Sequence, residues 1–432
     1  MAHLGIISPP VSGHLHPFGA LGRTLIKRGH RVTLFQMPDI ESKARAEGLN
    51  FYVLGQSSHP LGSLAKDLTH LTQLKALPAL RFTVQLIERT TEMICRDLPD
   101  ALSKAGVDLL LVDQTEPAGA VVANHLKIPF VTVCNAMAIN RESTVPPIFT
   151  GWAYSSSFCA RIRNELGYKV WDFMMRPIAR VLKRYAKQWQ LPCYQDHEAY
   201  YSTLAQLSQQ PAAFDFPRQK LPACFHYLGP FRENASKEIG FPWAKLDGRP
   251  VIYASLGTLQ NRTPLLLRWI AEACEGLPAQ LVISHGGDLA VATTLPGSPL
   301  VVSYAPQQAL LAKGKLAISH AGLNTVLDSM SQGVPVVAVP LTYEQPAIAA
   351  RLRWTGAGHV IPLARFSASV LRQAIQRVLG TESYYTSARR VADSIRQAGG
   401  VEHAADIIEE IMRTGKPVVH VEGEPHALTA AR

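Results

Sequence analysis

The chain has 432 residues, of which 47% are hydrophobic and 18% charged, and its formal net charge is +10. This length exceeds one ordinary domain and predicts two domains of about 200 residues each. No apolar run is long enough to cross a bilayer, and the six cysteines are scattered singly. These features argue against a membrane-spanning protein, a disulfide framework and a zinc site. The first residues lack the features of a secretory signal, so we expect a cytoplasmic protein with reduced thiols.

The positive charge is compatible with three kinds of partner: nucleic acid, an anionic membrane surface and an anionic small substrate. The sequence contains no nucleic-acid-binding motif and no long block of Lys and Arg. We therefore favour the last two partners and expect no nucleic acid.

The first half of the chain alternates short apolar strands with helices. The predicted elements are a strand at Leu4–Ser8, a turn at Pro9–Pro17, a helix at Phe18–Arg28 and a strand at Arg31–Gln36. The pattern recurs with a strand at 107–112, a helix at 118–126 and a strand at 129–134. This alternation with short loops predicts right-handed βαβ units around a parallel sheet.

The same half of the chain also contains two predicted amphipathic helical regions, at His59–Leu98 and Phe158–Gln190. The second is unusually basic and aromatic, with eight Lys or Arg residues interleaved with Tyr, Trp and Phe. Such a region suits peripheral contact with an anionic membrane on its inner face. The alternative is a solvated helix face around an acceptor pocket.

The segment 228–250 is rich in Pro, Gly and charged residues, which predicts an interdomain linker. After it, the second half of the chain repeats the α/β alternation. A strand begins at Val251, and further strands are predicted at 279–284, 300–304, 316–319 and 334–339. A last helix is expected at Val401–Met412, followed by a loose tail. We therefore expect Rossmann-like domains at 1–227 and 251–400, a helix within 401–414 and a tail at 415–432. Two such domains predict a ligand in the cleft between them.

The first candidate site lies at the end of the first strand, where open α/β sheets place their active groups. His14 stands there, and a neutral imidazole accepts a proton near pH 7, so it is a candidate general base. Asp113 ends another strand at the same sheet edge and can orient His14 and stabilise its imidazolium. The alternatives are a histidine that only bonds its own turn and an aspartate that only caps a helix. Glu116 competes with Asp113 for the same role.

The second candidate site is the segment His320–Gln345, a strand, a small-residue turn, a helix start and another strand. His320 can donate to a phosphate, Gly322 allows close approach of the backbone, and Asn324 and Thr325 supply donors at the helix start. A helix N-terminus attracts anions through its unpaired N–H groups and its dipole, so this turn suits a diphosphate.

Neighbouring residues extend this second site. Asp328, one helical turn further on, suits a ribose diol, and Glu344 with Gln345 suits sugar hydroxyls. Weaker candidates follow other predicted strands. Gly257 and Thr258 suit phosphate, and the stretch from Tyr304 to Gln307 suits a nucleotide base. No DxD, HExxH or clustered His/Cys pattern predicts a metal site, so protein donors and the helix dipole are expected to stabilise the diphosphate.

Together these motifs resemble the inverting UDP-sugar glycosyltransferases, a family that includes plant secondary-metabolite glucosyltransferases and bacterial macrolide glycosyltransferases. Residues 304–345 resemble the donor signature of that family, and the resemblance runs from Gly13 and His14 to the last helix. The segments 112–122, 215–218 and 253–260 resemble in particular the bacterial zeaxanthin glucosyltransferases of carotenoid biosynthesis. The resemblance implies a GT-B fold, in which two Rossmann-like domains face each other across a cleft. The N-terminal domain would hold the acceptor, the C-terminal domain the UDP-sugar, and the last helix would cross back.

The resemblance also implies roles for single residues. His14 is the base and Asp113 its partner; His320, Asn324 and Thr325 contact the diphosphate, Asp328 the ribose, and Glu344 and Gln345 the sugar. Gln307 matches the Gln of the motif, and Tyr304 stands where plant members stack a Trp on uracil. Three departures are visible: Tyr304 for that Trp, Asp328 for the usual Glu, and Ala321 with Leu323 for a plant Cys and Trp.

The expected reaction is transfer of glucose from UDP-glucose, as co-substrate, to the hydroxyls of zeaxanthin, with inversion and without metal or cofactor. Mono- and then di-β-glucosides are the expected products. One alternative keeps the reaction with another lipophilic acceptor, such as a macrolide, flavonoid or sterol. A dinucleotide-dependent oxidoreductase is less favoured because no GxGxxG follows the first strand. A nucleotide-sugar-binding protein without catalysis is less favoured because His14 and Asp113 are both present.

Overall fold

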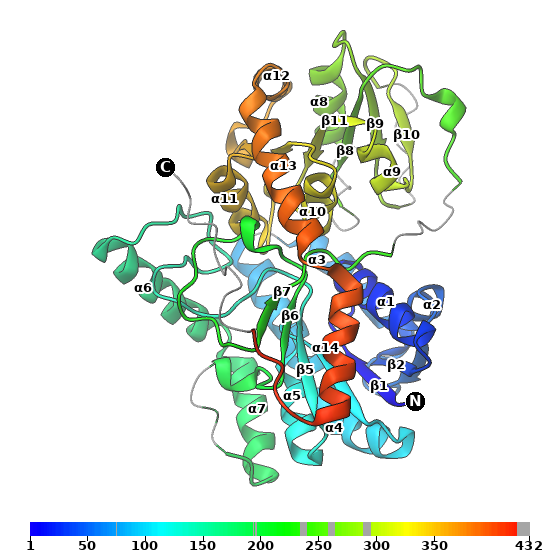
Figure 1. The fold of residues 1–432 in the computed structure, drawn as a ribbon, viewed down its shortest axis with the longest axis vertical. Helices are drawn as coiled ribbons and strands as arrows, with labels where there is room; N and C mark the ends of the chain where they lie inside the picture. The colour runs from blue at the N-terminus through cyan, green and yellow to red at the C-terminus, as the bar shows by residue number, and fades with distance from the viewer. Residues whose placement is uncertain are drawn as a thin grey trace.

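The computed structural model describes residues 1–74, 76–192, 194, 197–233, 240–257, 264–287 and 295–420. Two parallel β-sheets, each flanked by helices, form the lower and upper halves of the molecule in Figure 1. The expected α/β architecture with two Rossmann-like halves is confirmed. Among the described residues, no helix is both long and apolar enough to cross a membrane.

The first half is built on a seven-stranded parallel sheet with the order β3-β2-β1-β4-β5-β6-β7. Its strands are β1 (His3–Ile7), β2 (Arg31–Gln36), β3 (Asn50–Val53), β4 (Leu109–Asp113), β5 (Phe130–Cys134), β6 (Gln206–Ser208) and β7 (Phe225–Tyr227). Its helices are α1 (Ser12–Lys27), α2 (Glu41–Ala46), α3 (Ser63–Gln73), α4 (Ala76–Ala105), α5 (Pro117–Leu126), α6 (Phe158–Met174) and α7 (Arg176–Gln188). The strand order reverses between β1 and β4, and such a switch point is where open α/β sheets bind ligands.

The second half repeats this plan in a six-stranded parallel sheet with the order β10-β9-β8-β11-β12-β13. Its strands are β8 (Val251–Ser255), β9 (Gln280–Ser284), β10 (Leu300–Val302), β11 (Gly314–Ser319), β12 (Val336–Ala338) and β13 (Gly358–Val360). Its helices are α8 (Pro264–Cys274), α9 (Gln307–Leu311), α10 (Leu323–Ser331), α11 (Gln345–Thr355), α12 (Ala368–Leu379) and α13 (Glu382–Gln397). Here the order reverses between β8 and β11.

Burial on both faces explains why the strands are almost continuously apolar. In β8, Tyr253 packs into the core on one face of the second sheet, whereas Ile252 and Ala254 pack into the core on the other. Alternate side chains of a strand point to opposite faces, so a sheet covered by helices on both sides needs apolar residues at every position. The short strands β3, β6, β7 and β13 carry too few residues for this signal and were not predicted.

Helix α1 begins at Ser12, so the predicted turn at Pro9–Pro17 is wrong in its second half. Pro17 lies inside the helix and has no backbone N–H, so it makes no hydrogen bond to the Gly13 carbonyl four residues earlier. That carbonyl instead accepts a hydrogen bond of 2.8 Å from Nδ2 of Asn324, which belongs to the second half. The proline that suggested a turn therefore lies in a helix whose first turn contacts the other half of the molecule.

The last helix, α14 (Gly400–Thr414), lies beside α1 in the first half (Figure 1). Its side chains Ile407, Ile408 and Ile411 belong to the core of the first half. Arg28 at the end of α1 pairs with three acids of α14, namely Glu402, Asp406 and Glu409. Residues 416–420, expected in a loose tail, continue onto the first half, where the backbone N–H of Val418 donates to Leu204.

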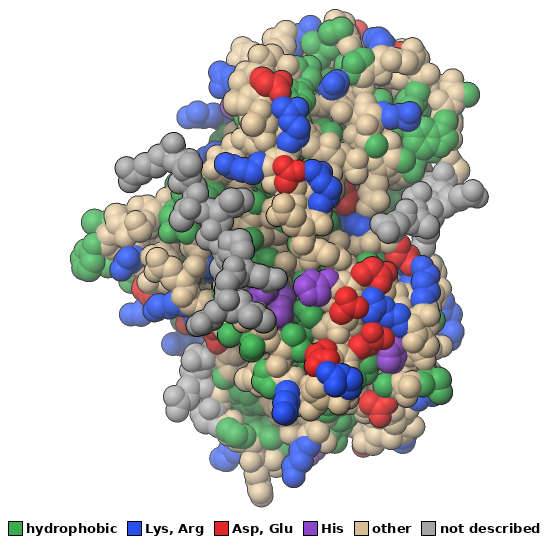
Figure 2. All heavy atoms as spheres, viewed as in Figure 1, with side chains coloured by type: hydrophobic (Ala, Val, Ile, Leu, Met, Phe, Trp, Pro, Cys, Tyr) green, Lys and Arg blue, Asp and Glu red, His purple; other side chains and the backbone are tan. Residues whose placement is uncertain are grey.

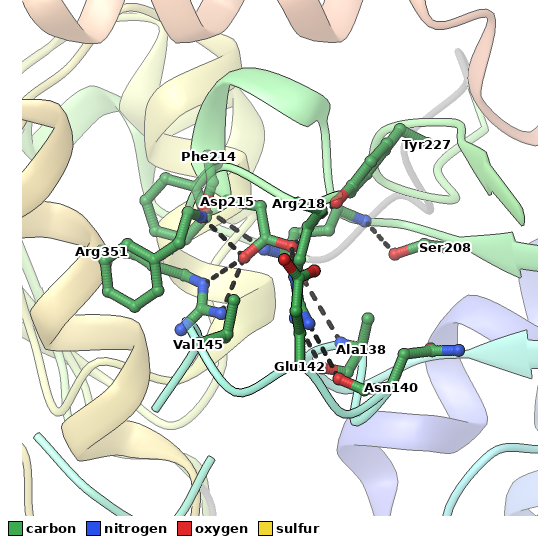
Figure 3. A network of polar contacts seen from close by, with 12 residues as sticks. Ala138, Asn140, Glu142, Val145, Ser208, Phe214, Asp215, Arg218, Tyr227 and Arg351 are labelled. Carbon is green, nitrogen blue, oxygen red and sulfur yellow. Dashed lines mark hydrogen bonds and ion pairs between the residues drawn. The ribbon is translucent and has the colours of Figure 1, made fainter. Parts of the chain in front are cut away.

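A buried ionic cluster joins the two halves, and we call Asp215, Arg218 and Arg351 the interdomain hub (Figure 3). Arg351 of α11 is fully buried and donates from Nε to Oδ1 of Asp215 at 2.8 Å. Arg218 and Tyr227 donate to the other carboxylate oxygen at 3.0 and 2.8 Å. The Arg351 guanidinium also lies 4.2 Å from the ring centre of Phe216. Burial opposes ionisation of Asp215, but the two arginines lower its pKa to about 2.

Candidate active site between the two halves

His14 and Asp113 meet at the switch point of the first sheet. β1 and β4 are hydrogen-bonded neighbours with Ile7 opposite Val112, so the first turn of α1 lies beside the end of β4. His14 Nδ1 is 2.8 Å from Oδ2 of Asp113. The carboxylate is fully buried, whereas 16% of the imidazole is exposed. A carboxylate accepts only from a protonated Nδ1, so Nε2 is the basic nitrogen presented to a substrate.

Further residues hold the Asp113 carboxylate in place. Oδ1 accepts from the backbone N–H and the hydroxyl of Thr115, and Oδ2 accepts from Nδ2 of Asn135 at 2.9 Å. Sequence reasoning missed Asn135, because β5 brings it to Asp113 only in the folded sheet. Glu116, the competing acid, is also buried, but Asp113 is the residue that bonds the imidazole.

Burial and charge oppose each other at this pair. Burial disfavours the imidazolium of His14, but the charge and hydrogen bond of Asp113, followed by the charge of Glu344, outweigh it and raise the pKa of His14. Burial likewise opposes ionisation of Asp113, yet His14 and the bonds from Thr115 lower the pKa of Asp113. Burial and the neighbouring Asp113 raise the pKa of Glu116 to about 8, so Glu116 is protonated at neutral pH. The arrangement stabilises the positive charge that a histidine base acquires.

His320 and two glycines form the turn at the switch point of the second sheet. β8 and β11 are neighbours with Ser255 opposite Ser319, which places Gly257 and His320 side by side. A Cβ atom on Gly257 would lie 2.8 Å from the imidazole, and one on Gly322 would lie 2.5 Å from it, so both positions require glycine. Burial lowers the pKa of His320 to about 4. The ring is therefore neutral and can donate one N–H.

Helix α10 follows directly, and no side chain caps its N-terminus. Its N-cap Gly322 is extended, and the preceding Ala321 is fully buried with φ of +66°. A non-glycine residue in this region costs about 1 kcal/mol and typically occurs where function constrains the backbone. The open helix end, with Asn324 and Thr325 in its first turn, can receive an anion.

Three of the residues predicted to bind the sugar donor, Thr325, Gln307 and Asp328, form one chain of hydrogen bonds. Gln307 accepts from the Thr325 hydroxyl at 3.3 Å through Oε1 and donates from Nε2 to Oδ2 of Asp328 at 2.6 Å. Tyr253 also donates to Oε1 of Gln307. Asn324, in the first turn of α10, instead donates to the Gly13 carbonyl of the first half.

Arg232 is a site residue that sequence reasoning missed. Its Nε lies 2.8 Å from Oδ1 of Asp328, and its Nη2 donates to Oδ1 of Asn324 at 3.0 Å. It comes from the segment that we predicted as a linker, whose Phe231 is fully buried in the core of the first half. The next residue, Glu233, pairs with Arg23 of α1. The segment therefore ties α1 to α10 at the candidate diphosphate site.

The remaining predicted residues lie around this group. Glu344 precedes α11 and is close enough to His14 to raise its pKa. Gln345 is buried and accepts through Oε1 from the backbone N–H groups of residues 341 and 342. Tyr304 is 57% exposed, and its hydroxyl donates to Gly286. Thr258 lies outside the described residues.

Comparison with known structures identifies the class of protein. The calicheamicin glycosyltransferase CalG4 superposes with a TM-score of 0.76 at 22% identity, covering 96% of this chain and 100% of that chain. The glycosyltransferase SnogD from Streptomyces nogalater superposes with a TM-score of 0.69 at 19% identity, covering 95% and 99%. The two facing Rossmann-like halves are thus the GT-B fold that was expected.

Sequence comparison identifies the family. The model of UDP-glucoronosyl and UDP-glucosyl transferases matches residues 56–429. The zeaxanthin glucosyltransferase of Pantoea ananas is 38% identical, covering 99% of this chain and 100% of that protein. The zeaxanthin glucosyltransferase of Pseudescherichia vulneris is 33% identical, covering 97% and 100%. The chain belongs to the UDP-glucoronosyl and UDP-glucosyl transferase family and is a glycosyltransferase.

Proposed function

We propose that the enzyme transfers glucose from UDP-glucose to the hydroxyls of zeaxanthin with inversion at the anomeric carbon. One observation carries the site assignment: the turn that holds His14 contacts the start of α10 directly, through the 2.8 Å bond from Asn324 to Gly13. A base and a diphosphate site on facing elements suit direct displacement. The metal-free, cofactor-free reaction expected from the sequence is part of this proposal.

In the proposed mechanism, His14 Nε2 takes the proton of the acceptor hydroxyl. The hydroxyl oxygen forms a bond to the anomeric carbon from the face opposite UDP, while the bond from that carbon to the diphosphate oxygen breaks. An α-linked donor therefore gives a β-glucoside. Asp113 stabilises the imidazolium, and the start of α10 with His320 stabilises the charge that grows on the diphosphate, which lowers the barrier selectively.

The acceptor assignment is supported by the two zeaxanthin glucosyltransferases, which match the chain over nearly its whole length. We propose that residues 1–227 bind the acceptor and residues 251–400 the donor. Phe149, Tyr168 and Trp171 contribute an apolar and aromatic wall to a small cavity in the first half, whose volume of about 20 Å³ has room for one water molecule. Zeaxanthin carries two hydroxyls, so the monoglucoside is released and rebound before the diglucoside forms.

The substitution His14→Ala tests the assignment. Loss of a general base costs typically 10²–10⁴-fold in rate, so kcat is expected to fall about that much with UDP-glucose and zeaxanthin. UDP binding by calorimetry serves as the control and is expected to stay near that of the wild type. Near-wild-type turnover in this variant would rule out His14 as the base. If instead flavonoids, macrolides or sterols, but not zeaxanthin, are glucosylated by the wild type, only the acceptor assignment is wrong.

A further inference from the structure

The outer face of α6 is an exposed apolar stripe. Five large hydrophobic side chains of this helix are between 45% and 77% exposed, namely Phe158, Ile162, Leu166, Val170 and Phe173. Their spacing of three or four residues places them on one side of the helix. Contiguous apolar patches of this kind mark interaction surfaces. Figure 2 shows hydrophobic side chains at the tip of the projection formed by α6, with Lys and Arg side chains beside them.

The opposite face of α6 is held firmly by the first half of the molecule. Asn164 Nδ2 and the Tyr168 hydroxyl donate to the backbone carbonyls of residues 143 and 145, each at 2.8 Å. A Cβ atom on Gly167 would lie 2.9 Å from Pro147, so the helix packs closely there. Tyr168 and Trp171 on α6 also line the aromatic cavity. Helix α6 thus presents an exposed apolar surface on one side and packs against the proposed acceptor-binding half on the other.

The charged residues around this stripe indicate which kind of partner covers it. Residues 158–190 contain eight Lys or Arg and only two acids, so this segment supplies much of the net charge of the chain. Asp172, one of the two acids, is paired with Arg141. The Arg176 guanidinium lies 4.9 Å from the ring centre of Phe173, which places a cation directly beside the stripe. Apolar side chains flanked by cations match the headgroup boundary of an anionic bilayer.

We propose that the apolar stripe of α6 is the face by which the enzyme docks on an anionic membrane. Within the basic aromatic region 158–190, the membrane contact is assigned to α6, because the apolar side of α7 packs against the rest of the first half. Ile178, Val181 and Leu182 of α7 are buried in the core of the first half. For its purpose, extraction of a lipophilic acceptor from the bilayer, the proposal rests on the proposed function.

The test is flotation of the full chain with vesicles of phosphatidylglycerol and phosphatidylcholine, in the absence of donor and acceptor. Wild type is expected to float with anionic vesicles and not with pure phosphatidylcholine. The double variant Phe158→Ser/Phe173→Ser is expected to lose about tenfold or more in partitioning, because burying two aromatic side chains drives insertion. Leu265→Ser, on a comparably exposed apolar residue of α8, is the matched control and retains flotation.

A fluorescent probe locates the contact. Cys159 is exposed on α6, whereas the other described cysteines are buried, so a polarity-sensitive dye on Cys159 in a Cys193→Ser background reports insertion as a blue shift.

Unchanged flotation of the double variant, or no flotation of wild type, overturns the proposal. A concentration-dependent dimer that the double variant abolishes also overturns it, because a second copy then covers the stripe. Glucosylation of detergent-dispersed acceptor is expected to be equal in wild type and double variant, which separates failure here from failure of the proposed function.

Discussion

Two of the polar contacts that join the halves of this glycosyltransferase differ in how far water reaches them. At the interdomain hub, the side chains of Asp215 and Arg351 are 1% and 0% exposed. In the contact between Arg232 and Asp328, the side chains are 21% and 7% exposed, and Asn324 shares the arginine. The hub lies among buried aromatic and aliphatic groups, whereas the second contact consists of residues assigned to the donor.

This difference separates a permanent joint from an exchangeable one. Removing either partner of a buried pair leaves a charge without water, so the hub holds the two halves together at a fixed point. Replacing one residue of a partly exposed pair costs little free energy, because water or a ligand then binds the other residue. The contact of Arg232 can therefore open when a donor offers a ribose to Asp328 and a diphosphate to Asn324.

The largest effect is expected at the hub. Arg351→Met leaves the Asp215 carboxylate buried with one cation fewer, and breaking such a pair costs about 3–5 kcal/mol of unfolding free energy. Urea denaturation measures this loss. The matched control is Arg353→Met on the same helix, whose exposed side chain donates to the Gly151 carbonyl and is expected to contribute little to stability. Equal losses in both variants would contradict the view of the hub as the fixed joint.

Acid is expected to weaken the same joint. The pKa of Asp215 is about 2 in the folded chain against an ordinary value of 3.8. Its contribution is therefore complete above about pH 4 and is lost as the pH falls toward 2, which amounts to about 2 kcal/mol in total. The difference in unfolding free energy between wild type and Arg351→Met should shrink when urea titrations are repeated at pH 5 and pH 3. A constant difference would show that ionisation of Asp215 does not support the joint.

These residues also show where sequence reasoning succeeds and fails. The contact between His14 and Asp113 and the position of His320 at a sheet edge were predictable because apolar strands are visible in one sequence and parallel strands bring their carboxyl ends to a single edge. Arg232, Asn135 and Arg351 were missed because their partners are distant along the chain. Asn135 reaches Asp113 through strand pairing, and Arg351 reaches Asp215 across two sheets, which no local pattern encodes. The fold was therefore predictable in outline, whereas the joints between its halves were not.

The smallest expected effect is at the exchangeable contact. We propose that ribose binding to Asp328 releases the guanidinium of Arg232 beside the diphosphate, where a charge-assisted hydrogen bond would contribute about 1.5–3 kcal/mol. Arg232→Gln is therefore expected to weaken UDP binding by about tenfold, measured by calorimetry. Uridine, which lacks the diphosphate, is expected to bind both proteins equally. Arg249→Gln, which removes an exposed arginine paired with Asp247, is the matched control.

The comparison of UDP with uridine decides what Arg232 does. If Arg232 only positions α10, the substitution weakens both ligands alike, because the whole site shifts. If it only blocks the site, both ligands bind more tightly once Asp328 and Asn324 are free. A loss confined to UDP requires the positive charge to act on the diphosphate itself. In that case Arg232 pairs with Asp328 in the free enzyme and with the diphosphate in the donor complex. The contact of Arg232 would then differ from the hub in function as well as in exposure.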